Sequence, residues 1–303
     1  MRKGKFYGII TPLITPFKED EEIDFNGLET LLNFLKDKVD GMFVNATTGE
    51  FTSLNKDEKI EILKFVKDKI KDKVKLFSNI TSTSFKEVKE LIEISNNLNY
   101  DAIVITPPYF LIPNTQGMKN YFQLILETTK IPLLIYNIPT HTGYSLSVEI
   151  IKEIALSNEK LIGVKATIDS LNYIKDLIFL IKSKREEFSV FTGVESYLTS
   201  TLISGGDGGI VALSNFAPDL MKSVIINYEK KEFDLLIENH RKILNLFEIY
   251  KYSSSFAGAI KIALNILGFP IKRVVRTPLI QDDEDKVDKI KEVLNNLKLL
   301  TKE

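Results

Sequence analysis

Short apolar runs alternate with longer amphipathic stretches along most of the chain, and this alternation restricts the fold more than any other feature. Apolar runs of about four to eight residues are typical of buried strands, and longer stretches with apolar residues three and four apart are typical of helices. Eight runs predict strands, at Gly8–Ile10, Met42–Ala46, Lys75–Ile80, Ala102–Thr106, Pro132–Tyr136, Leu161–Lys165, Phe188–Thr192 and Gly209–Leu213. The stretches between them predict helices near residues 24–38, 55–71, 84–97, 115–130, 147–156, 170–182 and 195–204. Two of these helices begin with a capping-box pattern, from Asn55 to Glu58 and from Ser84 to Glu87.

Eight strands that are each followed by a helix predict an α/β fold with parallel strands and crossover helices. Eight such units that close on themselves form a (β/α)8 TIM barrel. An open doubly wound sheet is disfavoured because no glycine-rich phosphate loop opens the first helix, and the glycine-rich segment 205–209 precedes a strand and predicts a turn. After residue 216 only helical patterns follow, at 231–250, 254–267 and 282–300. We therefore expect a barrel over residues 1–225 that carries the active site, and a C-terminal helical region over residues 226–303 packed on it.

The composition excludes several classes of function. The chain has 40 basic and 41 acidic residues and a net charge of −1, so we expect neither nucleic acid nor an anionic membrane surface as a partner. It has no cysteine and only two histidines, which leaves no thiolate or multi-histidine metal site, so we expect no metal and no cofactor. The amino-terminal residues hold no apolar signal core, and no apolar run approaches the roughly 20 residues of a membrane span. A cytoplasmic location is the corresponding prediction.

A lysine ends the sixth predicted strand. Active sites of (β/α)8 barrels lie at the carboxyl ends of the strands, and Lys165 directly follows the apolar run Leu161–Val164. An amine in an apolar barrel mouth loses hydration, which favours the neutral form that attacks a ketone. Tyr136 ends the preceding strand, so we expect it beside Lys165, where a phenol can move protons for Schiff-base chemistry. The same positions also suit a lysine that reaches solvent and an aromatic side chain that packs under a loop.

Other polar residues follow other predicted strands. Thr47 and Thr48 could bind a carboxylate with their hydroxyls and turn amides, although ordinary turn chemistry explains them as well. Glu195 could bind a sugar-like hydroxyl, or serve only as a first-turn acid of the next helix. His141 has no partner histidine and is interpreted as a surface or loop residue.

Four motifs together resemble a known family. The motifs are Gly8-x-x-x-Pro12-x-x-Thr-Pro-Phe17, Thr47-Thr-Gly-Glu50, Tyr136-Asn-Ile-Pro139 and Gly163-Val-Lys165. With these motifs the chain is similar, in order and spacing over nearly its whole length, to the dihydrodipicolinate synthase / N-acetylneuraminate lyase superfamily of class I pyruvate-dependent aldolases. The resemblance implies pyruvate chemistry on a (β/α)8 barrel and a homotetramer built as a dimer of dimers.

The resemblance also implies a role for each site residue. Lys165 matches the lysine that forms the imine, Tyr136 the proton-relay tyrosine and Thr47 the relay threonine. Thr48 matches the residue that binds the pyruvate carboxylate, and the backbone of Ile210 lines the same pocket. The full set of expected substrate-binding residues is Thr48, Gly49, Ile210, Gly193, Glu195 and Tyr109.

The sequence departs from the synthase branch of this superfamily at three positions. His141 stands where that branch has an arginine that binds the carboxylate of aspartate semialdehyde, and Ala46 replaces the usual glycine before the two threonines. Phe110 stands where a second relay tyrosine crosses the dimer interface. The loss of a guanidinium and a hydroxyl together disfavours lysine biosynthesis. One hypothesis is that Tyr109 supplies the missing hydroxyl; the alternative is that Tyr109 and Phe110 only pack at a dimer contact.

These departures favour reversible cleavage of a 2-keto-3-deoxy sugar acid, of the 2-keto-3-deoxygluconate type, to pyruvate and an aldehyde. The archaeal 2-keto-3-deoxygluconate aldolases are the branch that the sequence resembles in character. The alternatives are a 4-hydroxy-tetrahydrodipicolinate synthase, an N-acetylneuraminate lyase and a sugar-acid dehydratase of the same superfamily. A non-enzymatic alternative is a barrel that binds a 2-oxo acid as a sensor, although binding alone does not need both Lys165 and Tyr136.

Overall fold

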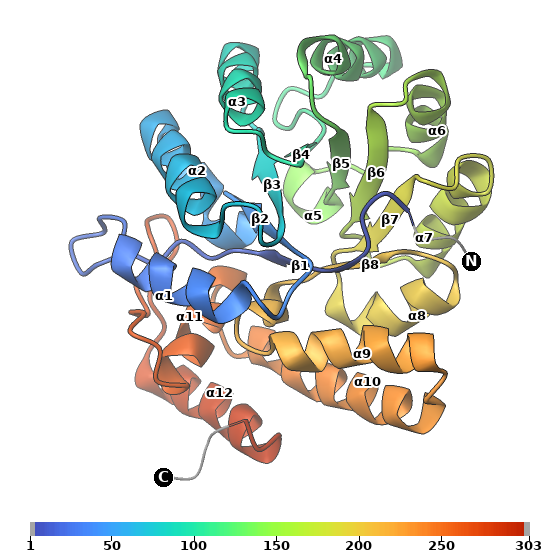
Figure 1. Cartoon of the computed structure of the whole chain (residues 1–303). Helices are drawn as coiled ribbons and strands as arrows, with labels where there is room; N and C mark the ends of the chain where they lie inside the picture. Colours follow the sequence, from blue (N-terminus) through green and yellow to red (C-terminus); the bar gives the residue numbers. More distant parts are fainter. Residues whose placement is uncertain (1–3, 300–303) are drawn as a thin grey trace. The chain divides into compact units, whose positions relative to one another are not determined.

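The computed structural model describes residues 4–299 and contains all eight predicted strands (Figure 1). The strands follow one another from β1 to β8 in a closed barrel, with helices between them, which confirms the predicted fold class. Their bounds are β1 (Gly8–Pro12), β2 (Gly41–Val44), β3 (Lys75–Asn79), β4 (Ala102–Ile105), β5 (Leu133–Asn137), β6 (Leu161–Ala166), β7 (Ser189–Thr192) and β8 (Gly208–Ile210).

The helices also follow the predicted pattern. The α-helices are α1 (Phe25–Leu35), α2 (Lys56–Ile70), α3 (Phe85–Asn97), α4 (Thr115–Thr128), α5 (Pro139–Thr142), α6 (Val148–Ser157), α7 (Leu171–Leu177), α8 (Leu198–Ile203), α9 (Pro218–Lys230), α10 (Phe233–Phe247), α11 (Phe256–Ile266) and α12 (Glu284–Asn296). Helix α9 was not predicted separately, and the last residue of the predicted helix 282–300 lies outside the described residues. None of the helices within residues 4–299 is long and apolar enough to cross a membrane.

The chain divides into two compact units. The first contains residues up to 8 together with residues 75–210, and therefore β3 to β8 with α3 to α8. The second contains residues 9–74 and those from 211 onward, and therefore most of β1, β2, α1, α2 and α9 to α12. The predicted boundary between a barrel over residues 1–225 and a helical region over residues 226–303 was drawn from the pattern of strands and helices, and it remains a prediction.

The core of the first unit is made of strands that are buried along their whole length, as in β4 to β7. Strands covered on both faces need apolar side chains at consecutive positions, which explains the continuous apolar runs in the sequence. The helices supply the cover with apolar stripes: α3, for example, buries Val88, Leu91 and Ile92, three and one residues apart. Such a frame fixes the strand ends from which polar side chains project.

Helix α11 is the most buried helix of the second unit, with every residue from Ala257 to Leu264 buried. It begins at Ser255, whose hydroxyl accepts a hydrogen bond from the Gly258 N–H at 3.0 Å. Helix α2 begins with the predicted capping box, in which the side chains of Asn55 and Glu58 each accept from the other's backbone N–H.

Two local predictions were wrong. The eighth strand ends at Ile210 rather than Leu213, because the chain turns into a 3-10 helix at Ala212–Asn215. There the Ser214 hydroxyl donates to the Val211 carbonyl, and the Asn215 amide donates to the Pro12 carbonyl at 2.9 Å. The second capping box is also absent, since Ser84 makes no side-chain cap and Glu87 instead accepts from the Ser82 hydroxyl at 2.9 Å.

Candidate active site

Lys165 and Tyr136 are neighbours at the carboxyl ends of β6 and β5. They are Cα partners in the strand register, as the sequence predicted, and both are buried, with 3% and 2% of their surface exposed. The Lys165 Nζ atom lies 4.0 Å from the centroid of the Tyr136 ring. An amine and a phenol are therefore held together where barrel enzymes carry their catalytic residues.

Asn137 fixes the strand ends that carry this pair. Its carbonyl accepts the Thr167 N–H at 2.8 Å, which ties the end of β5 to the residue after β6. Its side chain donates to the Ser145 hydroxyl and accepts the Leu146 N–H, both at 3.1 Å. The loop after α5 is thus attached to the same point as the reactive pair.

Thr167 was not among the predicted site residues, although it lies two positions after Lys165. Its Oγ1 atom is buried and has no hydrogen-bond partner within residues 4–299. A Cβ at Gly193 would lie 1.8 Å from Thr167 Oγ1 and 2.9 Å from Lys165 Cε, so only glycine leaves room for both side chains. Side chains two apart on a strand share a face, and this period could have revealed Thr167 from the sequence.

His141 lies on the short helix α5, directly after the strand that carries Tyr136. Its Nδ1 atom is 3.0 Å from the Thr140 hydroxyl. Burial, and to a smaller extent the positive charge of Lys165, lower the pKa of His141 below its usual 6.5. The imidazole is therefore neutral near pH 7, and it offers a hydrogen bond rather than a positive charge.

Tyr109 and Phe110 follow β4 and line a pocket of the first unit. The pocket has a volume of about 310 Å³ and is lined by Tyr109, Phe110, Ser82, Phe85, Tyr121 and neighbouring residues. Phe110 has a left-handed backbone, with φ 71°, and is 90% exposed. Burial, and to a smaller extent the charge of Glu87, raise the pKa of the Tyr109 phenol.

The remaining predicted residues of the first unit lie at the ends of β7 and β8. Glu195 is buried at the start of the 3-10 helix Glu195–Tyr197, directly after the loop that contains Gly193. Ile210 is the buried last residue of β8. Among residues 4–299 no group of three or more histidine, aspartate or glutamate side chains could hold a metal ion.

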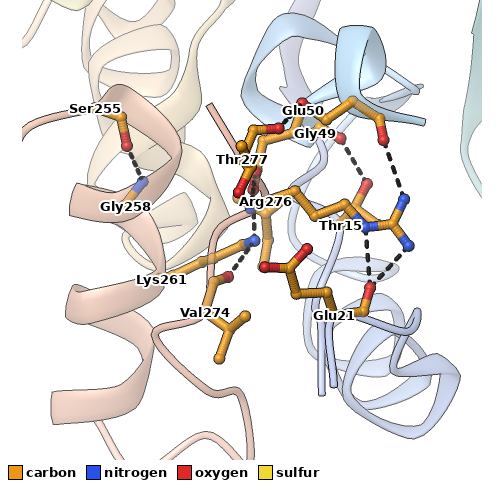
Figure 2. Close-up of polar contacts among 12 residues, drawn as sticks. Thr15, Glu21, Gly49, Glu50, Ser255, Gly258, Lys261, Val274, Arg276 and Thr277 are labelled. Atoms are coloured by element: carbon orange, nitrogen blue, oxygen red, sulfur yellow. Dashed lines mark hydrogen bonds and ion pairs between the residues drawn. The ribbon is translucent and has the colours of Figure 1, made fainter. Parts of the chain in front are cut away.

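The threonines Thr47 and Thr48 belong to the second unit, where they form a 3-10 turn with Gly49 after β2. The Thr15 hydroxyl donates to the Gly49 carbonyl at 2.8 Å, as Figure 2 shows. A Cβ at Gly49 would lie 2.7 Å from the Leu13 carbonyl oxygen, so the turn is packed tightly against the residues that follow β1. The turn presents two hydroxyls on a backbone that has little room to move.

Glu50 ends this turn, and its side chain points away from solvent to a lysine of α11 (Figure 2). Its Oε1 atom accepts from Lys261 Nζ at 2.5 Å, and its Oε2 atom accepts the Arg276 N–H at 2.9 Å. The side chains of Glu50 and Lys261 are 1% and 0% exposed. Glu50 belongs to the motif Thr47-Thr-Gly-Glu50, but nothing in the sequence around it predicts either partner.

Comparison with known proteins gives the relatives of the chain. Residues 5–297 match the family described as the dihydrodipicolinate synthetase family. A protein of Thermococcus kodakarensis named as an uncharacterised DapA-like lyase is 40% identical over 291 residues, 95% of this chain and 98% of that protein. The putative 2-dehydro-3-deoxy-D-gluconate aldolase YagE of Escherichia coli is 30% identical over 295 residues, 97% of this chain and 98% of that protein.

Solved structures agree with these relatives. The crystal structure of YagE in complex with pyruvate matches with a TM-score of 0.94, at 30% identity, and covers 97% of this chain and 99% of that one. The structure of dihydrodipicolinate synthase from Thermotoga maritima matches with a TM-score of 0.92, at 27% identity, and covers 98% of this chain and all of that one.

Proposed function

Since the chain belongs to the dihydrodipicolinate synthetase family, we propose that it is a metal-independent lyase in which Lys165 forms a Schiff base with pyruvate. The proposed reaction is the reversible cleavage of a 2-keto-3-deoxy sugar acid, such as 2-keto-3-deoxygluconate, to pyruvate and an aldehyde. The observation that carries this proposal is the register pairing of Lys165 with Tyr136, with the lysine Nζ 4.0 Å from the phenol ring.

The chemistry follows from an amine and a phenol at one place. The neutral Lys165 amine attacks C2 of the keto acid, and the carbinolamine loses its hydroxyl as water when a proton is supplied. The iminium then accepts the electron pair of the C3–C4 bond while the C4 hydroxyl loses its proton, so that an aldehyde leaves. The resulting enamine is protonated at C3, and water releases pyruvate and restores the amine. Tyr136 is the residue placed to carry these protons.

The resemblance to the family suggests roles for the residues of the second unit and for Ile210. Thr47 is proposed as a relay hydroxyl for Tyr136, and Thr48 and Gly49 as the binding site of the pyruvate carboxylate. A rigid turn that carries two hydroxyls suits a carboxylate. Ile210 is proposed to line the pyruvate pocket through its backbone.

The choice of a sugar acid rests on the first unit. A neutral imidazole at His141 cannot replace the guanidinium fork that an anionic aldehyde needs. Thr167 has a buried hydroxyl without a partner within residues 4–299, next to Lys165 and Gly193, and a substrate hydroxyl would satisfy it. Glu195 is proposed as a second ligand for the polyol chain. The relative YagE, named a putative 2-dehydro-3-deoxy-D-gluconate aldolase, supports this substrate class.

The experiment that tests the proposal is borohydride trapping in the presence of pyruvate, followed by peptide mapping. We expect the adduct at Lys165, no turnover in Lys165→Ala, and normal turnover in the control Lys152→Ala on α6. A chelator is expected to leave activity unchanged. Cleavage of 2-keto-3-deoxygluconate should exceed condensation of pyruvate with aspartate semialdehyde by roughly tenfold to a hundredfold in kcat/KM. An adduct on another lysine would refute the mechanism, and equal efficiency with aspartate semialdehyde would reverse the substrate assignment.

Tyr109 is proposed to supply the hydroxyl that Phe110 lacks. Its phenol is half-buried in the pocket beside Phe110, whereas the Phe110 side chain is almost fully exposed. We expect Tyr109→Phe to lower kcat at least about tenfold with the oligomer intact, because an acid–base group is lost. Phe110→Tyr should change kcat little. If Tyr109→Phe has normal turnover and Phe110→Tyr is faster, Tyr109 has no such role.

A cytoplasmic homotetramer is part of the same proposal. The exposed apolar run Phe110, Leu111 and Ile112 in the first unit supports an assembly, because such a run is normally covered by another subunit.

A further inference from the structure

Glu50 has a backbone conformation that its residue type disfavours. Its φ and ψ angles are 56° and 37°, in the left-handed region, between the two 3-10 helices Thr47–Gly49 and Phe51–Ser53. A residue with a Cβ is disfavoured in this region, whereas glycine adopts it freely. Contacts of the Glu50 side chain must therefore hold the backbone in place.

Those contacts join the turn to the carboxyl-terminal part of the second unit. Lys261 donates both to Glu50 and to the Val274 carbonyl, the latter at 2.7 Å, and its Nζ atom lies 4.2 Å from the centroid of the Phe17 ring. The Arg276 N–H donates to the other carboxylate oxygen of Glu50. Figure 2 shows Lys261 and Arg276 beside Glu50. Both carboxylate oxygens are thus engaged.

The Arg276 side chain attaches the same segment to the next helix. Its guanidinium donates to both Glu58 oxygens at 2.9 and 2.6 Å, to the Ser53 carbonyl at 3.1 Å, and to the Glu21 carbonyl at 2.9 and 2.7 Å. The residue that gives its N–H to Glu50 is therefore itself held by several bonds, which makes it a fixed support for the turn.

Stability alone does not account for the Glu50–Lys261 pair. Two charges removed from water lose hydration that their attraction recovers only in part, and apolar side chains of similar size often serve stability as well. Burial lowers the pKa of Lys261 to about 8, against the opposing effect of Glu50, so the folded protein disfavours the charge that the pair requires. What the pair does provide is a defined geometry for the residue at the end of the turn.

We infer that Glu50 and Lys261 are positioning residues, which hold the turn Thr47–Gly49 in the conformation that binds the carboxylate of the 2-oxo acid. The inference rests on the proposed function, because it assigns a task to a turn proposed as the pyruvate carboxylate site. Neither side chain contacts substrate in this assignment. They act through the backbone of the turn, whose hydroxyls and N–H groups would move if Glu50 relaxed.

The test compares single and double variants. Lys261→Met and Glu50→Gln each leave one buried partner unmatched, and either could fold poorly. The double variant Glu50→Gln with Lys261→Met leaves no buried charge uncompensated and keeps the volume of both side chains. The double variant Lys182→Met with Asp207→Asn is the matched control, since Lys182 forms a comparable buried pair with Asp207 in the first unit.

The readout is the pyruvate concentration that gives half-maximal borohydride trapping at Lys165, measured where circular dichroism shows every variant folded. We expect the double variant to melt near the wild-type temperature and yet to need about tenfold to a hundredfold more pyruvate, as misplaced binding groups do. Faster hydrogen exchange at the Gly49 and Glu50 amides should accompany this change. The control double variant Lys182→Met with Asp207→Asn should trap pyruvate at the wild-type concentration.

Two outcomes overturn the inference in distinguishable ways. If the double variant traps pyruvate at the wild-type concentration and exchanges Gly49 and Glu50 amides normally, the pair is structural only, and the proposed function stands. If the wild type itself forms no adduct at Lys165, the proposed function fails, and the inference fails with it.

Discussion

Within residues 4–299, each unit has a buried lysine–carboxylate pair, and these two pairs differ in what they hold. In the second unit, Lys261 and Glu50 fix a turn after the carboxyl end of β2. In the first unit, Lys182 donates to both oxygens of Asp207, which lies at the amino end of β8. Both pairs are almost fully shielded from solvent, so their chemistry alone does not distinguish them.

The surroundings of the pairs distinguish them. Asp207 also accepts the N–H groups of Gly4 at 2.6 Å and Val190 at 2.8 Å, and so joins the amino-terminal segment to the start of β7. The amino ends of barrel strands serve stability, whereas the carboxyl ends carry the chemistry. If Glu50 and Lys261 position the turn as we infer, one kind of ion pair serves folding at the amino end of a strand and function at the carboxyl end.

Asp207→Asn should produce the largest change in the free energy of unfolding, and it tests whether the Lys182–Asp207 pair serves stability alone. The substitution leaves the Lys182 ammonium buried without a counter-charge, which typically destabilises a protein by about 3–5 kcal/mol. We expect a loss of that size in the free energy of unfolding from urea titration. The pyruvate concentration for half-maximal trapping should stay within about twofold of wild type, because the pair lies away from the carboxyl ends of the strands. A large shift in that concentration, with stability unchanged, would erase the distinction between the two pairs.

The sequence predicted the features that depend on local periodicity. Each strand is an apolar run because it is covered on both faces, and Lys165 and Tyr136 each end such a run. Parallel strands of similar length bring residues at equivalent ends together, so the register partnership of Lys165 with Tyr136 followed from their positions alone. The family motifs added roles for these residues, which periodicity could not give.

The features that the sequence did not reveal depend on contacts between distant residues. Glu50 and Lys261 are 211 positions apart, and the sequence around neither residue identifies the other as its partner. A lysine within the otherwise apolar stretch 257–264 of α11 was the available signal, since such a residue needs a buried partner. The apolar run 209–213 predicted a strand that is too long. The hydrogen bonds of Ser214 and Asn215 that turn the chain after Ile210 leave no mark in its hydrophobic pattern.

The pH dependence of stability should separate the two pairs further, with a smaller effect. The pKa of Lys261 is about 8 in the folded protein and 10.5 as the ordinary value. Between these pH values the unfolded chain binds more protons, so the contribution of Lys261 to the free energy of unfolding rises with pH and is least favourable below pH 8. Burial raises the pKa of Asp207 above its usual 3.8, against the opposing charge of Lys182. The ionised Asp207 carboxylate therefore lowers the free energy of unfolding above the raised pKa, and this loss is removed as the pH falls toward 3.8 and the group is protonated.

The two pairs should thus respond at opposite ends of the pH scale. We expect the difference in unfolding free energy between wild type and Lys261→Met to shift in favour of wild type by roughly 3 kcal/mol between pH 7 and 10.5, since one pKa unit corresponds to about 1.4 kcal/mol. The difference in unfolding free energy between wild type and Asp207→Asn should stay constant over that range. It should change only in acid, where the wild type becomes more stable relative to the variant. Urea titrations of the three proteins at matched pH values measure both differences. If the Lys261→Met difference is flat from pH 7 to 10.5, desolvation does not dominate at Lys261, and Glu50 stabilises its charge fully. In that case the pair would contribute stability as well as geometry, and the contrast with Lys182 and Asp207 would rest on position alone.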